Sequence, residues 1–139
     1  MKLLFIDDEP HNVSLVMEIL QETFPQAQLQ LAENAKDSID LLSAQPWDLV
    51  IMDIFLPLGK LEHTLGRRAE QYHDNLRHLG GLAILDFVEK MPQKPKILAH
   101  TACTDYALIE VLGSVVDDRI PKPAPLDMLL QSIQRHCGG

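Results

Sequence analysis

The chain has 139 residues, a formal net charge of −8, 46% hydrophobic residues and 23% charged residues. This length and composition fit one globular domain with a hydrophobic core and exclude a fibrous or disordered chain. The acidic balance argues against nonspecific nucleic-acid binding, which needs a basic face, and no apolar run is long enough to cross a bilayer.

Ten predicted elements follow one another along the chain as five strand–helix pairs. Apolar residues at steps of three and four indicate the helices, whereas alternating or continuous apolar runs indicate the strands. The LVIM run at 49–52 is uninterrupted, as in a parallel strand that is buried on both faces. In chain order the predicted elements are strand 2–7, helix 12–24, strand 27–32, helix 35–45, strand 48–53, helix 82–91, strand 94–101, helix 105–115, strand 119–122 and helix 126–137.

The alternation of strands and helices predicts an α/β fold, a doubly wound parallel sheet with helices on both faces. Right-handed crossovers leave few topologies for such a chain. The flavodoxin-like (βα)5 arrangement with strand order 2-1-3-4-5 is the common one at this size. We expect a single domain over 1–139, with a helical or loop insertion at about 58–79.

Reactive side chains stand at the ends of four predicted strands, where sites form in open α/β sheets. Asp7 and Asp8 end the first strand, Asp53 the third, Thr101 the fourth and Lys122 the fifth. Clustered carboxylates repel one another without a cation, and Mg²⁺ takes oxygen ligands of this kind. A carboxylate beside such a metal can attack phosphorus, while an amine and a hydroxyl hold phosphoryl oxygens. For one such residue a solvated loop position is the better interpretation, but for five at these strand ends it is poor.

The segments FIDDEP, DLVIMDIFLP, ILAHTA and IPKP resemble, in this order, the motifs of response regulator receiver domains of two-component signalling. The resemblance covers nearly the whole chain. It implies that Asp53 accepts phosphate from a sensor histidine kinase or a histidine phosphotransfer protein, and that Thr101 and Lys122 hold the phosphoryl group. The Mg²⁺ ligands that it implies are Asp7 (mostly through a metal-bound water), Asp8, Asp53 and the backbone carbonyl of Phe55.

Two residues depart from the family's pattern near the expected site. Arg119 stands where the family usually has an aromatic switch residue, three positions before the lysine. Its side chain is either exposed or paired with a carboxylate such as Asp117 or Asp118. Phe55 lies two residues after the acceptor, where a bulky apolar side chain either excludes water and slows dephosphorylation or packs on the insertion.

The segment 58–79 is a third departure, because the family's pattern has no counterpart for it. Its apolar residues recur at steps of three and four, which indicates one helical face, although Gly59 and Gly66 weaken that prediction. Two interpretations stay open for this face. It folds back on the domain's own core, or it binds a downstream protein or a second copy of the chain.

Two functional hypotheses follow. The first is a phosphoaccepting receiver of a two-component system or phosphorelay, with only self-phosphorylation and self-dephosphorylation chemistry and therefore not an enzyme. The second is an adaptor that binds a partner through 58–79 without phosphorylation. An aspartate-nucleophile phosphohydrolase is disfavoured, because it would normally carry an acid at the position of Phe55. We expect a cytoplasmic protein with reduced thiols at Cys103 and Cys137, no nucleic-acid or membrane partner, and output through protein contacts.

Overall fold

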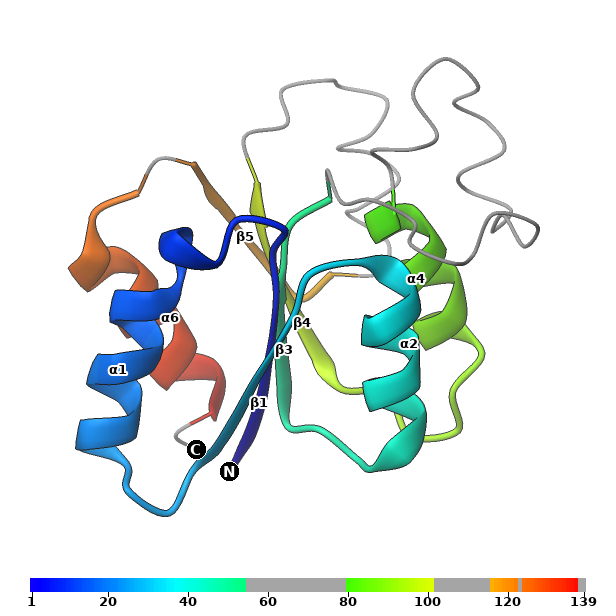
Figure 1. Cartoon of the computed structure of the whole chain (residues 1–139), viewed down its shortest axis with the longest axis horizontal. Helices are drawn as coiled ribbons and strands as arrows, with labels where there is room; N and C mark the ends of the chain where they lie inside the picture. The colour runs from blue at the N-terminus through cyan, green and yellow to red at the C-terminus, as the bar shows by residue number, and fades with distance from the viewer. Residues whose placement is uncertain (55–79, 102–115, 123, 138–139) are drawn as a thin grey trace.

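A five-stranded parallel sheet forms the centre of the computed structural model, which describes residues 1–54, 80–101, 116–122 and 124–137 (Figure 1). The strand order is β2-β1-β3-β4-β5, so the predicted flavodoxin-like topology is confirmed. The strands are β1 (Lys2–Ile6), β2 (Gln28–Ala32), β3 (Leu49–Met52), β4 (Lys96–Thr101) and β5 (Asp118–Pro121).

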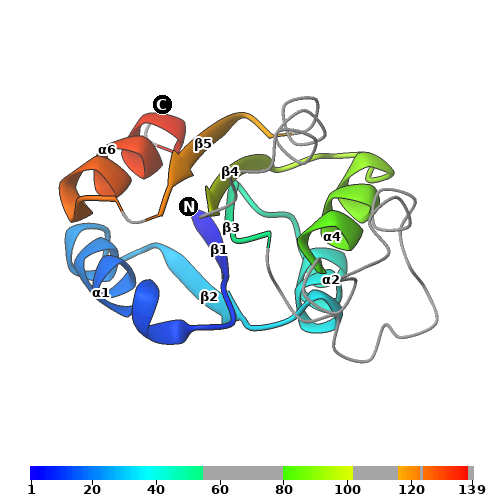
Figure 2. The same ribbon diagram turned by 90° about the horizontal axis from the view of Figure 1, so that it is seen from above.

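Helices cover both faces of the sheet (Figure 2). On one face α1 (Ser14–Thr23), preceded by the 3-10 turn η1 (Pro10–Asn12), lies beside α6 (Leu126–Cys137). On the other face α2 (Ala35–Ala44) lies beside α4 (Gly80–Glu89). Within the described part of the chain, no helix is long and apolar enough to span a membrane. The predicted helix at 105–115 and the insertion at 58–79 lie outside the described residues.

The core is divided into two apolar clusters by the sheet. Successive residues of a strand point to opposite faces, so Leu3 and Phe5 of β1 pack toward α1 and α6. Leu4 and Ile6 pack toward α2 and α4, and all four side chains are buried. Strand β3 is buried on both faces and is apolar throughout, and the charged Asp53 follows its last residue.

Helix α4 runs from Gly80 to Glu89, two residues earlier than the predicted range 82–91. A close backbone approach occurs at Gly81, near the first described residues of this helix. The Gly81 amide donates to the carbonyl of Ile54 at 3.1 Å, and a Cβ on Gly81 would lie 2.6 Å from the Ile54 Cα. Only glycine fits this contact without a shift, and it holds α4 against the residue that follows Asp53.

Candidate functional site

Three aspartates meet at the carboxyl ends of the two central strands. Asp7 and Asp8 follow β1 and Asp53 follows β3, and these strands are hydrogen-bonded neighbours. The amide of Asp7 donates to Ala32 at 3.0 Å and that of Asp53 to Ile6 at 2.9 Å, so each residue extends the backbone ladder. One oxygen from each carboxylate lies within 4.8 Å of the other two. The rigid sheet therefore brings the three groups together.

The three carboxylates differ in exposure. Asp7 is 2% exposed and Asp53 is 8% exposed, whereas Asp8 lies at the surface. Partial desolvation raises the pKa of Asp8, and the nearby negative charges of Asp7 and Asp53 raise it further. The charges of Asp7 and Asp53 therefore disfavour the ionised form of Asp8. A cation bound among the three carboxylates would relieve this repulsion.

Lys122 supplies one such cation from the end of β5. Its Nζ donates to Oδ2 of Asp7 at 2.6 Å and to Oδ2 of Asp53 at 2.9 Å. Burial lowers the pKa of Lys122, but the hydrogen bonds to both carboxylates outweigh this and hold it above its ordinary value. The ammonium therefore stays charged. This group therefore combines three carboxyl groups with one ammonium.

Thr101 is the last residue of β4 and is 2% exposed. Strand β4 lies between β3 and β5, so its end separates Asp53 from the backbone of Lys122. The carbonyl of Thr101 accepts the amide of Lys122 at 3.1 Å, which ties the start of the lysine's loop to this strand. The predicted Asp7, Asp8, Asp53, Thr101 and Lys122 thus share one edge of the sheet, whereas Phe55 lies outside the described residues.

The donor set fits a small divalent cation. An octahedral ion with oxygen ligands at about 2.1 Å holds those ligands about 3 to 4 Å apart, and the carboxylate oxygens lie within 4.8 Å of one another. Carboxylates are among the ligands that Mg²⁺ prefers, and this group supplies three of them. Both oxygens of Asp7 already accept hydrogen bonds, from the Glu9 amide at 2.9 Å and from Lys122.

Comparisons with known proteins show which sequences and structures the chain is similar to. The chain is 26% identical over 135 residues to the sensory transduction protein LytR of Staphylococcus haemolyticus, an alignment that covers 97% of this chain and 44% of that protein. The chain therefore spans less than half the length of this curated relative. No protein-family profile matches the chain.

Solved structures of receiver domains match the fold of the chain over nearly its whole length. The receiver domain of HemR from Leptospira biflexa superimposes with a TM-score of 0.74 at 18% identity, covering 99% of this chain and 94% of that one. A complex of the Saccharomyces cerevisiae histidine phosphotransfer protein Ypd1 with the receiver domain of Ssk1 matches with a TM-score of 0.67 at 21% identity, covering 99% and 89%. The chain has the receiver-domain fold.

In this receiver fold Arg119 is exposed on β5, which agrees with the first of the two interpretations for its side chain. Its neighbour Asp118 contacts α6 instead, through Arg135 at 2.8 Å and His136 at 3.1 Å. The hydrogen bond between the Arg119 amide and Asp118 keeps that carboxylate at the start of the strand. Position 119 therefore adds no aromatic side chain to the core of this receiver fold.

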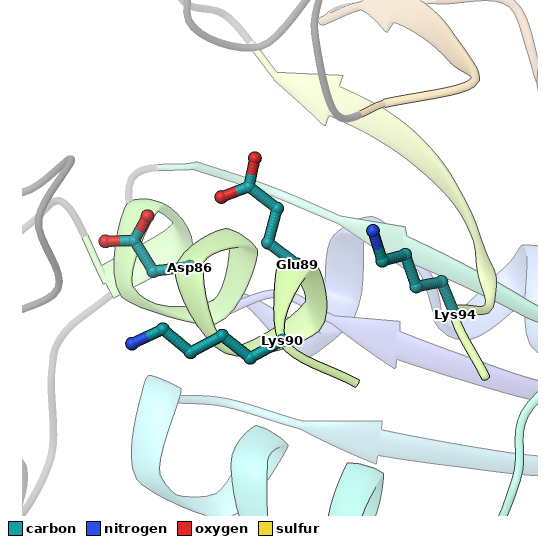
Figure 3. A pocket seen from close by; sticks show the side chains of 4 residues that line it. All are labelled: Asp86, Glu89, Lys90 and Lys94. Carbon is teal, nitrogen blue, oxygen red and sulfur yellow. The ribbon is translucent and has the colours of Figure 1, made fainter. Parts of the chain in front are cut away.

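A pocket of about 430 Å³ lies beside α4, away from the aspartate cluster, and sequence reasoning did not single out its lining (Figure 3). Asp86 is 6% exposed although it is charged, and its only sequence signal is an acid within the apolar run LAILDFV. The four labelled side chains extend in different directions and do not converge on one point. They comprise two acids and two bases, namely Asp86, Glu89, Lys90 and Lys94.

Proposed function

We propose that the chain is a phosphoaccepting receiver of a two-component system or phosphorelay, phosphorylated on Asp53. The observation that carries this proposal is the position of the Asp53 carboxylate. It ends a central strand, lies 2.9 Å from the Lys122 ammonium and shares a cluster with Asp7 and Asp8. The likeness to LytR and to receiver structures supports a signalling role over a general hydrolase.

The phosphoryl donor is a phosphohistidine on a sensor kinase or a histidine phosphotransfer protein. An Asp53 carboxylate oxygen attacks phosphorus, the new P–O bond forms as the P–N bond breaks, and the histidine nitrogen keeps the electron pair and takes a proton. In a separate, slow dephosphorylation step water attacks phosphorus, and the P–O bond to Asp53 breaks. This step releases inorganic phosphate and a proton and regenerates the Asp53 carboxylate. The pairing of a phosphotransfer protein with the Ssk1 receiver supports this class of partner.

The surrounding side chains favour the transfer by their charges and hydrogen bonds. The Lys122 ammonium, already beside Asp53, stabilises the negative charge on the phosphoryl oxygens. The Thr101 hydroxyl donates to another phosphoryl oxygen from the neighbouring strand. Asp8 and Asp53, with Asp7 acting through water, would hold Mg²⁺ at this cluster, and the ion would supply positive charge against the negative charge that builds up during the transfer.

The experiment that tests the proposal is incubation with Mg²⁺ and acetyl phosphate, followed by intact mass measurement. We expect an adduct with the mass of one phosphoryl group, which requires Mg²⁺ and is absent in Asp53→Asn. The matched control is Asp48→Asn, since Asp48 precedes the same strand and its side chain is 61% exposed. This control should be phosphorylated normally.

The absence of an adduct, together with no binding of beryllofluoride, would contradict the proposal. It would favour the alternative in which the chain is a phosphorylation-independent adaptor that binds a partner through 58–79. That segment lies outside the described residues, so this alternative rests on its sequence pattern alone. A homodimer formed through the same segment belongs to this alternative as well.

A further inference from the structure

His100 is a buried imidazole that the proposed phosphoryl transfer does not use. It belongs to β4, is 7% exposed and directly precedes Thr101. Its register partner on β5 is Ile120, and its Nδ1 lies 3.3 Å from the Ile120 carbonyl oxygen. A carbonyl oxygen only accepts hydrogen bonds, so Nδ1 carries the hydrogen and donates it to Ile120.

This hydrogen bond lies near the end of the edge strand β5. Strand β5 has one neighbour in the sheet, β4, and is paired with it over a short register that ends at Pro121. Because the amide of Lys122 donates to Thr101, the backbone groups of Pro121 face the open edge, and its missing N–H breaks no hydrogen bond to β4. Two hydrogen bonds hold this end of β5 against β4, from His100 to the carbonyl of Ile120 and from the amide of Lys122 to Thr101.

The position of the β5 end matters because the Lys122 side chain must reach across another strand. Neighbouring strands lie about 4.8 Å apart, so the axes of β5 and β3 are separated by about 10 Å. The Lys122 ammonium nevertheless contacts Asp53 after β3 and Asp7 after β1. Such a reach depends on where the backbone leaves β5, and a shift of about 1 Å at a reacting group can lower a rate by 100-fold.

We propose that His100 is a positioning residue for Lys122, because it holds the end of β5 against β4 so that the ammonium reaches Asp7 and Asp53. Burial lowers the pKa of His100, and nearby Lys122 lowers it further, so the ring stays neutral with one donor and one acceptor nitrogen. The kinetic consequence of this proposal rests on the proposed function, whereas the effect on the lysine's contacts does not.

Two substitutions at this position separate the hydrogen bond from the packing. In His100→Asn, the amide nitrogen is attached to Cγ as Nδ1 is in histidine, so a donor remains at the same reach. In His100→Leu, an apolar side chain still fills the space of the ring, but the hydrogen-bond donor is lost. The matched control is Ser38→Ala, which removes a buried hydrogen bond of 2.7 Å to the Asn34 carbonyl on the far helix α2.

The first readout is the ¹H–¹⁵N NMR signal of the Lys122 ammonium, assigned with Lys122→Met. We expect this slowly exchanging signal in the unmodified protein, in His100→Asn and in the Ser38→Ala control, and its loss in His100→Leu. The second readout is the rate of phosphorylation by acetyl phosphate, which should fall by about 10- to 100-fold only in His100→Leu.

The outcomes distinguish this proposal from the proposed function. If His100→Leu loses the Lys122 signal while the unmodified protein is never phosphorylated, the positioning role stands and the proposed function fails. An unchanged Lys122 signal and rate in a folded His100→Leu protein would overturn the positioning role. Equal losses of the Lys122 signal and of the phosphorylation rate in His100→Asn and His100→Leu would overturn it as well. If His100→Leu does not fold, the ¹⁵N shifts of the unmodified imidazole decide, and a hydrogen on Nε2 in place of Nδ1 refutes the proposal.

Discussion

Replacing Lys122 with methionine is expected to destabilise the protein, because the change leaves two buried carboxylates without their cation. The exposed side-chain fractions are 16% for Lys122, 3% for Asp7 and 11% for Asp53, so water cannot take over its role fully. Removing one partner of a buried ion pair costs about 3–5 kcal/mol, whereas an exposed pair such as Lys36–Asp40 contributes about 0.5 kcal/mol. Methionine keeps an unbranched apolar stem, which limits the loss from packing.

The stability that is lost in Lys122→Met depends on pH, and this dependence follows from the pKa of Lys122. Burial lowers this pKa, but the hydrogen bonds to the aspartates leave it raised in the folded protein. The lysine's contribution to the free energy of unfolding is therefore complete below its unfolded pKa of about 10.4. It is lost as the pH rises through the higher folded value. Excess Mg²⁺ should reduce the cost of the substitution, because a cation bound to the folded state stabilises it.

Urea unfolding in metal-free buffer, followed by the fluorescence of the single, buried Trp47, measures the free energy of unfolding. We expect Lys122→Met to lose about 3–5 kcal/mol and the control Lys36→Met to lose less than about 1 kcal/mol. Adding Asp53→Asn to Lys122→Met should recover part of the loss, because it removes one of the two carboxylates that contact Lys122. A Lys122→Met protein as stable as the control would refute the reasoning about the buried pair.

Three further predictions concern stability and can be measured in the same assay. Gly81→Ala should cost about 1–2 kcal/mol, since its Cβ would lie 2.6 Å from the Ile54 Cα, and increased stability would contradict this. Asp118→Asn should cost about 0.5–1.5 kcal/mol by weakening the contact with His136. Burial raises the pKa of Asp118, but the hydrogen bonds from His136 and the Arg119 amide and the charge of Arg135 together outweigh it, so the net pKa is lowered. The stability from this carboxylate is present above about pH 3.9 and is lost as the pH falls through the lower folded pKa. The free energy of unfolding of Asp118→Asn should therefore fall less steeply in acid than that of the unmodified protein, and equal slopes would argue against the contact. Burial lowers the pKa of His100, so the protein should lose stability as the pH falls below about 6.5. If His100→Leu loses as much stability over the same pH range, the loss comes from another group.

Much of the fold was predictable from the sequence because its signals are local. The apolar run of β3 and the helical spacing in α1 reflect burial on known faces, and right-handed crossovers leave few strand orders. The close approach of Gly81 to Ile54 was not predictable in this way, because it is a contact between segments that are separated along the chain.

The convergence of the aspartates followed from the same logic, because residues that end neighbouring parallel strands must share an edge of the sheet. Asp7, Asp8 and Asp53 could therefore be grouped before any coordinates were known. Their roles in metal binding and phosphoryl transfer remain predictions. The insertion at 58–79 lies outside the described residues, so its packing remains a prediction as well.

The order of the amino acids establishes which residue types stand at the strand ends, and so the chemistry available there. The contacts of one Lys122 ammonium with both Asp7 and Asp53, and of the His100 ring with the Ile120 carbonyl, arise only in the folded arrangement. Hydrogen bonds between residues distant along the chain depend on ångström-scale positions, which arise from the packing of all the elements together and not from any local pattern.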